Sequence, residues 1–293
     1  MNTIKLSDGN SIPAVGFGTC AIGSWQQDDD YVVEVILNAI KAGYRHFDTA
    51  SIYGTERSLG KAIKLSGIPR EDFYISTKVW DTQQGYQETL RAFEQSLTRL
   101  DMEYVDLYLV HWPYPEKTEQ TWKAMEVLHD LGKARSLGLS NFRRSDIEHI
   151  MSFAKVKPVY NQLELHPYFT QAEMDAYCKE KGIVVSCWSP LGSGGWNDVP
   201  ASEKPISDTV ISNIADKYGV SAGQVILKWD IQQGRVVIPK AESENNILNN
   251  LSLESFVLTD SELMEINALH RELRFGGDPD SATADNLQMV IPD

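Results

Sequence analysis

Residues 42–54 read AGYRHFDTASIYG and, with STKVW at 76–80 and LVHWP at 109–113, they point to one fold. In each stretch a short β-rich run ends in a side chain able to do chemistry: Asp48, Lys78 or His111. Tyr53 stands in the loop behind the first run. Reactive groups at the carboxyl ends of successive strands are typical of a barrel of parallel strands.

Similar β-rich runs alternate with helical patterns along the whole chain, which indicates repeated βα units. The eight expected strands are Ala14–Gly18, Arg45–Asp48, Phe73–Lys78, Val105–His111, Ala134–Ser140, Val159–Leu163, Ile183–Ser186 and Val236–Ile238. Without a linker or a change of composition, these units predict a single α/β domain over residues 1–293, a (β/α)8 TIM barrel. An N-terminal β-hairpin around Asp8-Gly9 is expected to close its bottom, and the C-terminal tail after Arg271 to lie at the active-site rim.

Helical periodicity supports this arrangement. Residues 86, 90, 93, 97 and 100 form one apolar stripe, and a second helix is expected to start after Asp28–Asp30 and to stop at Gly43. Capping boxes are expected at Thr170–Glu173 and Thr259–Glu262, where each threonine could satisfy free amides at a helix start.

The composition excludes several classes of protein. The formal net charge is -14 in 293 residues, which argues against a nucleic-acid partner. No segment approaches the roughly 20 apolar residues of a membrane span, and the polar start lacks a signal peptide, so a cytoplasmic location is expected. Cys20, Cys178 and Cys187 lack ligand spacing, so we expect no metal site, only buried or idle thiols.

Two short motifs are misleading. Residues 16–21 (GFGTCA) fit a dinucleotide fingerprint, but the helical period begins only near Asp29, whereas the fingerprint needs a helix to open within it. Tyr74 and Lys78 fit the YxxxK pair of short-chain dehydrogenases. That pair works on a helix, and here the residues belong to a strand that places them about 13 Å apart.

The strand-end residues form a chemically consistent set. A tyrosine is a poor proton donor at pH 7, and a neighbouring ammonium such as that of Lys78 is expected to lower its pKa. Asp48 would keep Lys78 charged and aimed, and a neutral His111 could donate a hydrogen bond to a substrate carbonyl. The group indicates general acid catalysis on a C=O bond. An ion pair with a purely structural role is the alternative.

The ordered motifs of nearly the whole chain resemble those of the aldo-keto reductases. They are GFGT (16–19), AGYRHFDTASIYG (42–54), TKVW (77–80), LVHWP (109–113), GLSNF (138–142), YNQLELHP (160–167), WSPLG (188–192) and IPK (238–240). The resemblance implies hydride transfer from NADH or NADPH to an aldehyde or ketone, with the family's tetrad at Asp48, Tyr53, Lys78 and His111.

The resemblance also implies a coenzyme site. Ser140, Asn141 and Gln162 would hold the carboxamide, and Trp188 would stack on the nicotinamide ring. Ser189, Leu191 and Ser193 would line the pyrophosphate loop, and Gly18 and Thr19 of the GFGT motif are also expected to bind the coenzyme. A glycine-rich strap, Gly192–Asn197, could cover the coenzyme.

Tryptophans next to the tetrad predict the character of the substrate pocket. Trp80 and Trp112 directly follow tetrad strands and are expected to wall an apolar cavity, and Trp25 is a weaker candidate for its rim. Ordinary packing under a loop is the alternative. The expected partner is therefore a small carbonyl compound, and the resemblance favours a monomer.

The segment VVIPKAESENN (236–246) bears on coenzyme choice. Relatives that use NADPH usually carry a serine directly after the lysine and an arginine six positions beyond it, where this chain has Ala241 and Asn246. Glu242 adds a negative charge beside Lys240, and the family's Glu-Asn pair for adenine is replaced by Asn249-Asn250. An Arg–phosphate contact is worth roughly 1.5–3 kcal/mol. NADH, or both coenzymes, is therefore expected, with strict NADPH use through Lys240 as the alternative.

Two other functions remain open at this point. A non-catalytic nicotinamide-binding barrel is disfavoured by the intact tetrad. Reduction of a conjugated C=C bond would call for a glutamate at the position of His111.

Overall fold

The structure, a computed structural model, describes residues 2–25, 29–192, 199–281 and 285–292. Eight parallel strands follow one another in sequence order within a single sheet. They are β3 (Phe17–Gly18), β4 (His46–Asp48), β5 (Tyr74–Val79), β6 (Val105–Val110), β7 (Ala134–Ser140), β8 (Tyr160–Glu164), β9 (Val184–Trp188) and β10 (Val236–Val237). All eight expected strands are confirmed, although several of their ends differ from the expectation.

The first and last strands meet and close the sheet. Val15 pairs with Val237 in parallel, the Gly16 amide donates to the Val237 carbonyl at 2.8 Å, and the Val237 amide donates to Ala14 at 2.9 Å. These contacts involve residues 14–16, the first part of the expected strand Ala14–Gly18. The sheet is thus a closed barrel, and the (β/α)8 prediction is confirmed.

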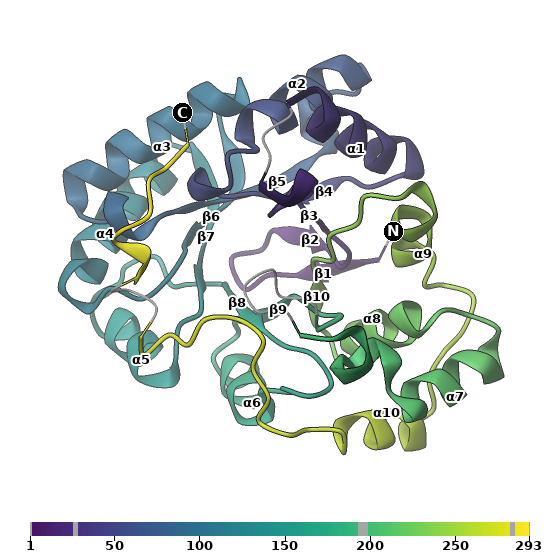
Figure 1. Ribbon diagram of the computed structural model, residues 1–293. Coiled ribbons are helices and arrows are strands. Elements are labelled where there is room, and N and C mark those ends of the chain that lie inside the picture. Colours follow the sequence, from purple (N-terminus) through teal and green to yellow (C-terminus); the bar gives the residue numbers. More distant parts are fainter. Residues whose placement is uncertain (1, 26–28, 193–198, 282–284, 293) are drawn as a thin grey trace.

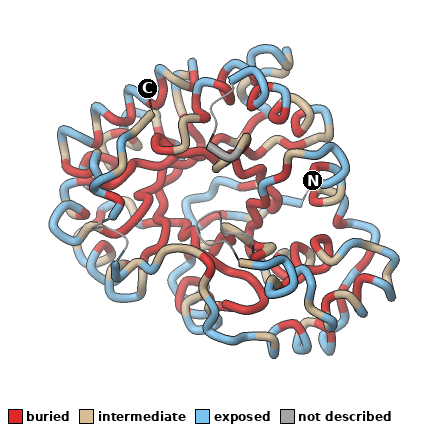
Figure 2. Tube along the Cα trace, in the orientation of Figure 1, coloured by how far each residue is buried: buried red, intermediate tan, exposed pale blue. Residues whose placement is uncertain are grey.

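Helices surround the barrel on its outside (Figure 1). They are α1 (Asp29–Ala42), α2 (Glu56–Ser66), α3 (Tyr86–Leu100), α4 (Pro115–Asp130), α5 (Arg144–Phe153), α6 (Ala172–Glu180), α7 (Thr209–Tyr218), α8 (Ala222–Gln232), α9 (Glu244–Leu251) and α10 (Asp260–Asn267). Figure 2 shows that burial follows the strands and the inward faces of the helices. None of the described helices is both long and apolar enough to cross a bilayer.

The predicted helix ends were right in one case and wrong in another. Thr259 caps α10 in a complete capping box with Glu262. Thr170 does not cap α6, because that helix starts at Ala172 and its N-cap is Gln171. The Thr170 hydroxyl instead lies 3.3 Å from a ring nitrogen of His270, far along the chain.

The N-terminal hairpin has the expected form. Strands β1 (Thr3–Lys5) and β2 (Ser11–Pro13) pair antiparallel. Leu6 and Ile12 are buried in one apolar cluster with Leu107 and Leu109 of β6. Since Tyr108, between those two leucines, packs outward on Phe93 of α3, Leu107 and Leu109 face the barrel interior. The hairpin therefore plugs the barrel at its amino-terminal end.

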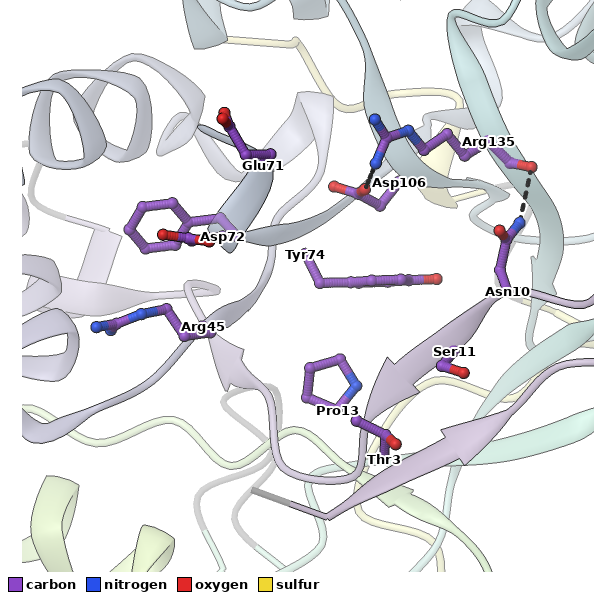
Figure 3. Close-up of a pocket in the computed structure, with 11 residues that line it drawn as sticks. Thr3, Asn10, Ser11, Pro13, Arg45, Glu71, Asp72, Tyr74, Asp106 and Arg135 are labelled. Atoms are coloured by element: carbon purple, nitrogen blue, oxygen red, sulfur yellow. Dashed lines mark hydrogen bonds and ion pairs between the residues drawn. The ribbon is translucent and has the colours of Figure 1, made fainter. Parts of the chain in front are cut away.

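A cavity of about 260 Å³ lies beside this hairpin, at the amino-terminal ends of the strands. Figure 3 shows Tyr74 reaching across it, with the Asp106–Arg135 ion pair on one side. Tyr74 begins β5 and Lys78 stands near its other end. The two residues of the apparent YxxxK pair therefore lie at opposite ends of the barrel, as predicted from their places in one strand.

The apparent dinucleotide motif also has a packing explanation. The short 3-10 helix η1 (Ile22–Trp25) and then α1 follow it, so no helix opens within the motif. A Cβ on Gly16 would lie 2.6 Å from the His46 ring, and one on Gly18 would lie 3.2 Å from the Ile238 carbonyl. Glycine is required here because neighbouring strands approach closely.

Candidate active site

Four strand-end residues converge at the carboxyl end of the barrel. Asp48 is the last residue of β4, Lys78 lies near the end of β5, and His111 directly follows β6. Tyr53 ends the 3-10 helix η2 (Ser51–Tyr53), and Gly54 after it adopts a left-handed conformation that favours glycine. These four side chains lie close together, as expected from their places at the ends of neighbouring strands.

Lys78 and Asp48 form a buried ion pair at the base of the site. The Lys78 Nζ lies 2.5 Å from Asp48 Oδ1 and donates to the Thr49 carbonyl at 2.9 Å. The second carboxylate oxygen of Asp48 accepts from Ser76 at 2.9 Å and from Gln162 at 3.0 Å. Because every polar atom of the pair has partners, the charges can be held without water.

The Tyr53 hydroxyl lies between two of these groups. Its oxygen is 3.4 Å from Lys78 Nζ and 3.3 Å from His111 Nε2. The His111 ring also meets Trp80 edge to face, at 4.8 Å between centroids. The Tyr53 hydroxyl is thus within hydrogen-bonding range of both Lys78 and His111.

Burial governs the ionisation of both aromatic groups. It raises the pKa of Tyr53 well above its ordinary value, with the neighbouring Cys20 and Asp48 acting in the same direction. The expected lowering of this pKa by Lys78 is therefore not seen, because Asp48 offsets the lysine charge and burial dominates. Burial, helped by the charge of Lys78, lowers the pKa of His111 well below its ordinary value. At neutral pH Tyr53 is protonated and His111 is neutral.

Cys20, one of the three thiols expected to be buried or idle, lies at this site. It neighbours Tyr53, Lys78 and Asp48, and burial raises the pKa of its thiol to about 12. Cys178 and Cys187 are buried elsewhere, and all three cysteines are free. The sequence held a signal for Cys20, since it follows the end of β3 as Asp48 ends β4.

The residues expected at the nicotinamide carboxamide are grouped together. Ser140 ends β7 and Gln162 lies in β8, and both are buried. Asn141 has a left-handed backbone (φ 63) and donates to the His111 carbonyl at 3.0 Å. Its side-chain oxygen accepts from the Trp188 indole at 2.9 Å. A single asparagine therefore ties Trp188 to the tetrad.

The remaining nicotinamide and pyrophosphate candidates differ in their availability. Thr19 is fully buried, and its hydroxyl bonds to the Asp48 carbonyl and to Thr55. This side chain therefore points into the protein interior. Ser189 has a positive φ of 47 and Leu191 is half-buried. Ser193, with most of the glycine-rich strap, lies outside the described residues.

The segment after β10 is organised around Glu242. Its carboxylate accepts from Lys240 at 2.6 Å, from the Tyr31 hydroxyl at 2.8 Å and from the Gly23 amide at 3.3 Å. Burial acts to raise the pKa of Glu242, but the bonds from Lys240 and Tyr31 hold it below its ordinary value. An ionised carboxylate thus sits directly on the lysine. The contact with Tyr31 was missed, since 211 residues separate the pair.

The asparagines of α9 face different surroundings. Asn246 is exposed in the first turn, Asn249 is half-buried, and Asn250 is buried.

Among the tryptophans, Trp80 and Trp112 are buried in a cluster with Ala50 and Ile52, against which Tyr53 packs. The side chain of Trp25 lies outside the described part of the structure.

Fold and site together define a (β/α)8 oxidoreductase that acts on carbonyl groups. The chain belongs to the aldo/keto reductase family, whose sequence profile matches residues 14–271. It is 41% identical to the 9,11-endoperoxide prostaglandin H2 reductase of Trypanosoma cruzi, over 96% of this chain and 95% of the relative. It is also 41% identical to the glyoxal reductase of Bacillus subtilis, over 95% and 96%. The crystal structure of an aldo-keto reductase from Bombyx mori in complex with NADP superposes with a TM-score of 0.87 at 34% identity, covering 95% of this chain and 96% of that one.

Membership of this family makes the chain an NAD(P)H-dependent reductase of carbonyl compounds. The residues at the site suit a nicotinamide group. Trp188 offers a half-buried aromatic ring whose edge is fixed by Asn141, and the amide and hydroxyl side chains of Ser140, Asn141 and Gln162 lie beside it. A flat ring that carries a carboxamide needs this combination of a stacking surface and polar partners.

Proposed function

We propose that this protein reduces aldehydes and ketones with Tyr53 as the proton donor. The observation that carries the proposal is the Tyr53 hydroxyl, held between the Lys78 ammonium and the neutral His111. A carbonyl oxygen at this point would accept hydrogen bonds from Tyr53 and from His111, which orients the C=O bond. When bound, the reduced nicotinamide supplies the hydride for the carbonyl carbon.

The protein's own residues then handle the proton. The Tyr53 O–H bond breaks, its proton passes to the carbonyl oxygen, and the phenolate that remains lies 3.4 Å from the Lys78 ammonium. That ammonium stabilises the phenolate by direct Coulomb attraction, and Asp48 fixes its position. Since burial keeps Tyr53 protonated at neutral pH, the resting enzyme is in the form needed for reduction.

A Tyr53→Phe variant tests this role. We expect kcat for benzaldehyde reduction to fall by roughly 10²–10⁴, while the Kd for NADH, measured by fluorescence titration, stays near that of the wild type. Equal turnover in the two proteins would refute the assignment. The alternative of C=C reduction is tested with cyclohexenone. The wild type should reduce benzaldehyde and leave the double bond of cyclohexenone intact. His111→Glu, which carries the glutamate that C=C reduction calls for, is the variant for comparison.

We further propose that NADH is preferred over NADPH, or that both are used. Lys240 would meet the adenosine ribose, and its charge is already matched by Glu242 at 2.6 Å. Ala241 offers no side-chain donor, and Asn246 is exposed and uncharged. A 2′-phosphate would be repelled by Glu242, whereas a free ribose hydroxyl could donate to it. The alternative is strict NADPH use through Lys240, and the Bombyx mori relative was crystallised in complex with NADP.

The measurement that decides between these coenzymes is kcat/KM for NADH and for NADPH with one aromatic aldehyde, at one pH and salt concentration. A ratio in favour of NADH supports the role of Glu242. A clear preference for NADPH would contradict it and leave the proposal for Tyr53 unaffected.

The proposed substrate pocket is apolar. Trp80 and Trp112 stand beside Tyr53 in one cluster with Ala50 and Ile52. Such a wall favours aromatic or extended carbonyl compounds over small polar ones, because their apolar surface leaves water on binding.

A further inference from the structure

Two of the points that attach the chain after α10 to the barrel lie far apart from each other. The first is Glu164, a fully buried carboxylate at the end of β8. It accepts from the backbone amides of Phe275 and Gly276, the latter at 3.0 Å, and Arg274 lies 3.4 Å away. Figure 1 shows the segment beyond, in yellow, running past α6 and α5 toward α4 and α3.

The second attachment is made by Asn286, which contacts the residues directly after β5. Its side-chain amide donates to Asp81 Oδ2 at 2.8 Å, and its carbonyl accepts from the Trp80 indole at 3.1 Å. Gln84 donates to the other Asp81 oxygen at 3.2 Å and to the Trp112 carbonyl at 2.8 Å. The bonds of Asn286 therefore reach Trp80 directly and Trp112 through Asp81 and Gln84.

Asp81 makes this attachment strong. The carboxylate is almost completely buried, and within the described residues it is hydrogen-bonded by two neutral amides, those of Gln84 and Asn286. A buried carboxylate is costly unless its oxygens are bonded. If Asn286 moved away, Asp81 Oδ2 would lose its hydrogen-bond donor while still buried. The cost of that loss keeps the segment in place.

The residues that follow Asn286 pack onto the tryptophan cluster of the proposed pocket. Met289 and Ile291 pack against the cluster of Trp80 and Trp112, whereas Val290 between them is 87% exposed. This alternation places every second side chain of the segment toward the cluster that also contacts Tyr53.

We propose that Asn286 is a specificity-determining positioning residue, which fixes Met289 and Ile291 as the apolar wall for large carbonyl substrates. The inference rests on the proposed carbonyl reduction at Tyr53. It predicts that a broken Asp81–Asn286 bond weakens the binding of large apolar aldehydes more than that of small ones.

Exchange of the two side chains, Asp81 and Asn286, tests the hydrogen bond between them. Asn286→Asp places two carboxylates together, Asp81→Asn removes an acceptor, and the double variant restores one donor and one acceptor. We expect each single variant to raise KM for 2-naphthaldehyde, relative to KM for methylglyoxal, by roughly tenfold, and the double variant to recover to within about twofold. Val290→Ala is the matched control and should keep the wild-type ratio, since its side chain faces solvent.

The outcomes separate this inference from the proposed function. Wild-type ratios in both single variants, an equal rise for both aldehydes, or no recovery in the double variant would each overturn it. Limited proteolysis gives a readout without catalysis: cleavage near the C-terminus should be faster in Asn286→Asp and slow again in the double variant. If the wild type reduced neither aldehyde, the proposed function would fail, and proteolysis would still show whether the bond holds the segment.

Discussion

Lys78 and Asp48 face each other from neighbouring strands, with 2.5 Å between Nζ and Oδ1 and both side chains almost fully buried. Register explains the pairing. Asp48 of β4 aligns with Ser76 of β5, and Lys78, two residues further, points to the same side. Thr77 between them points outward and donates to Glu56 of α2 at 2.6 Å. The alternation of one strand thus supplies the site and anchors a helix.

The two halves of this pair should differ in their contribution to stability. Asp48→Asn leaves a buried ammonium with the Thr49 carbonyl and Tyr53, so we expect the free energy of unfolding to fall by about 3–5 kcal/mol. Lys78→Met should cost less, because Ser76 and Gln162 still donate to Asp48. Urea denaturation at pH 7 measures both. Equal losses would contradict the hydrogen-bond argument.

Coenzyme selectivity should depend on Glu242. Glu242→Gln keeps an oxygen for Tyr31 but removes the charge that offsets Lys240, so the kcat/KM ratio of NADPH to NADH should rise by roughly three- to thirtyfold. Glu244→Gln, an exposed change of the same charge in the same segment, is the control. The same shift in both variants would show only a general charge effect.

Asp81 should make stability depend on pH. Burial raises its pKa from 3.8 to about 7, against the opposing bonds of Asn286 and Gln84. The folded state therefore binds this proton more tightly than the unfolded state, and stability is lost as pH rises from about 4 to 7. Between pH 5 and 8 the wild type should lose roughly 2–3 kcal/mol that Asp81→Asn does not.

Thermal or urea unfolding across that pH range checks this prediction. Asp230, whose pKa burial also raises to about 7, titrates in both proteins and cancels in the difference. Parallel curves for the wild type and Asp81→Asn would show that Asp81 does not titrate there.

Gly276 should be intolerant of a side chain. A Cβ there would lie 2.1 Å from the Trp188 ring, so Gly276→Ala must displace the indole. Since Trp188 is proposed to stack on nicotinamide, we expect Kd for NADH to rise roughly tenfold. Gly223→Ala, whose Cβ would meet Leu191 at an ordinary 3.8 Å, should bind NADH as the wild type does. Unchanged affinity in Gly276→Ala would argue against the stacking role.

The barrel and its tetrad were predictable because they depend on local regularities. Strand alternation and helical period follow from residues close in sequence, and parallel strands in a barrel bring their carboxyl ends together. Asp48, Lys78 and His111 needed no further information. The failed cap at Thr170 shows the limit, since its hydroxyl faces His270, 100 residues away, instead of the next helix.

The sequence by itself therefore determined the family, the barrel and the residues that end its strands. Only the tertiary structure decided how these groups behave and what completes the site. Burial, which no motif encodes, raises the pKa of Tyr53, where the sequence predicted a lower value. The contacts Tyr31–Glu242 and Asp81–Asn286 join residues 211 and 205 positions apart. Such pairs are set by the closure of the barrel and the course of the C-terminal segment, and neither leaves a periodic trace in the chain.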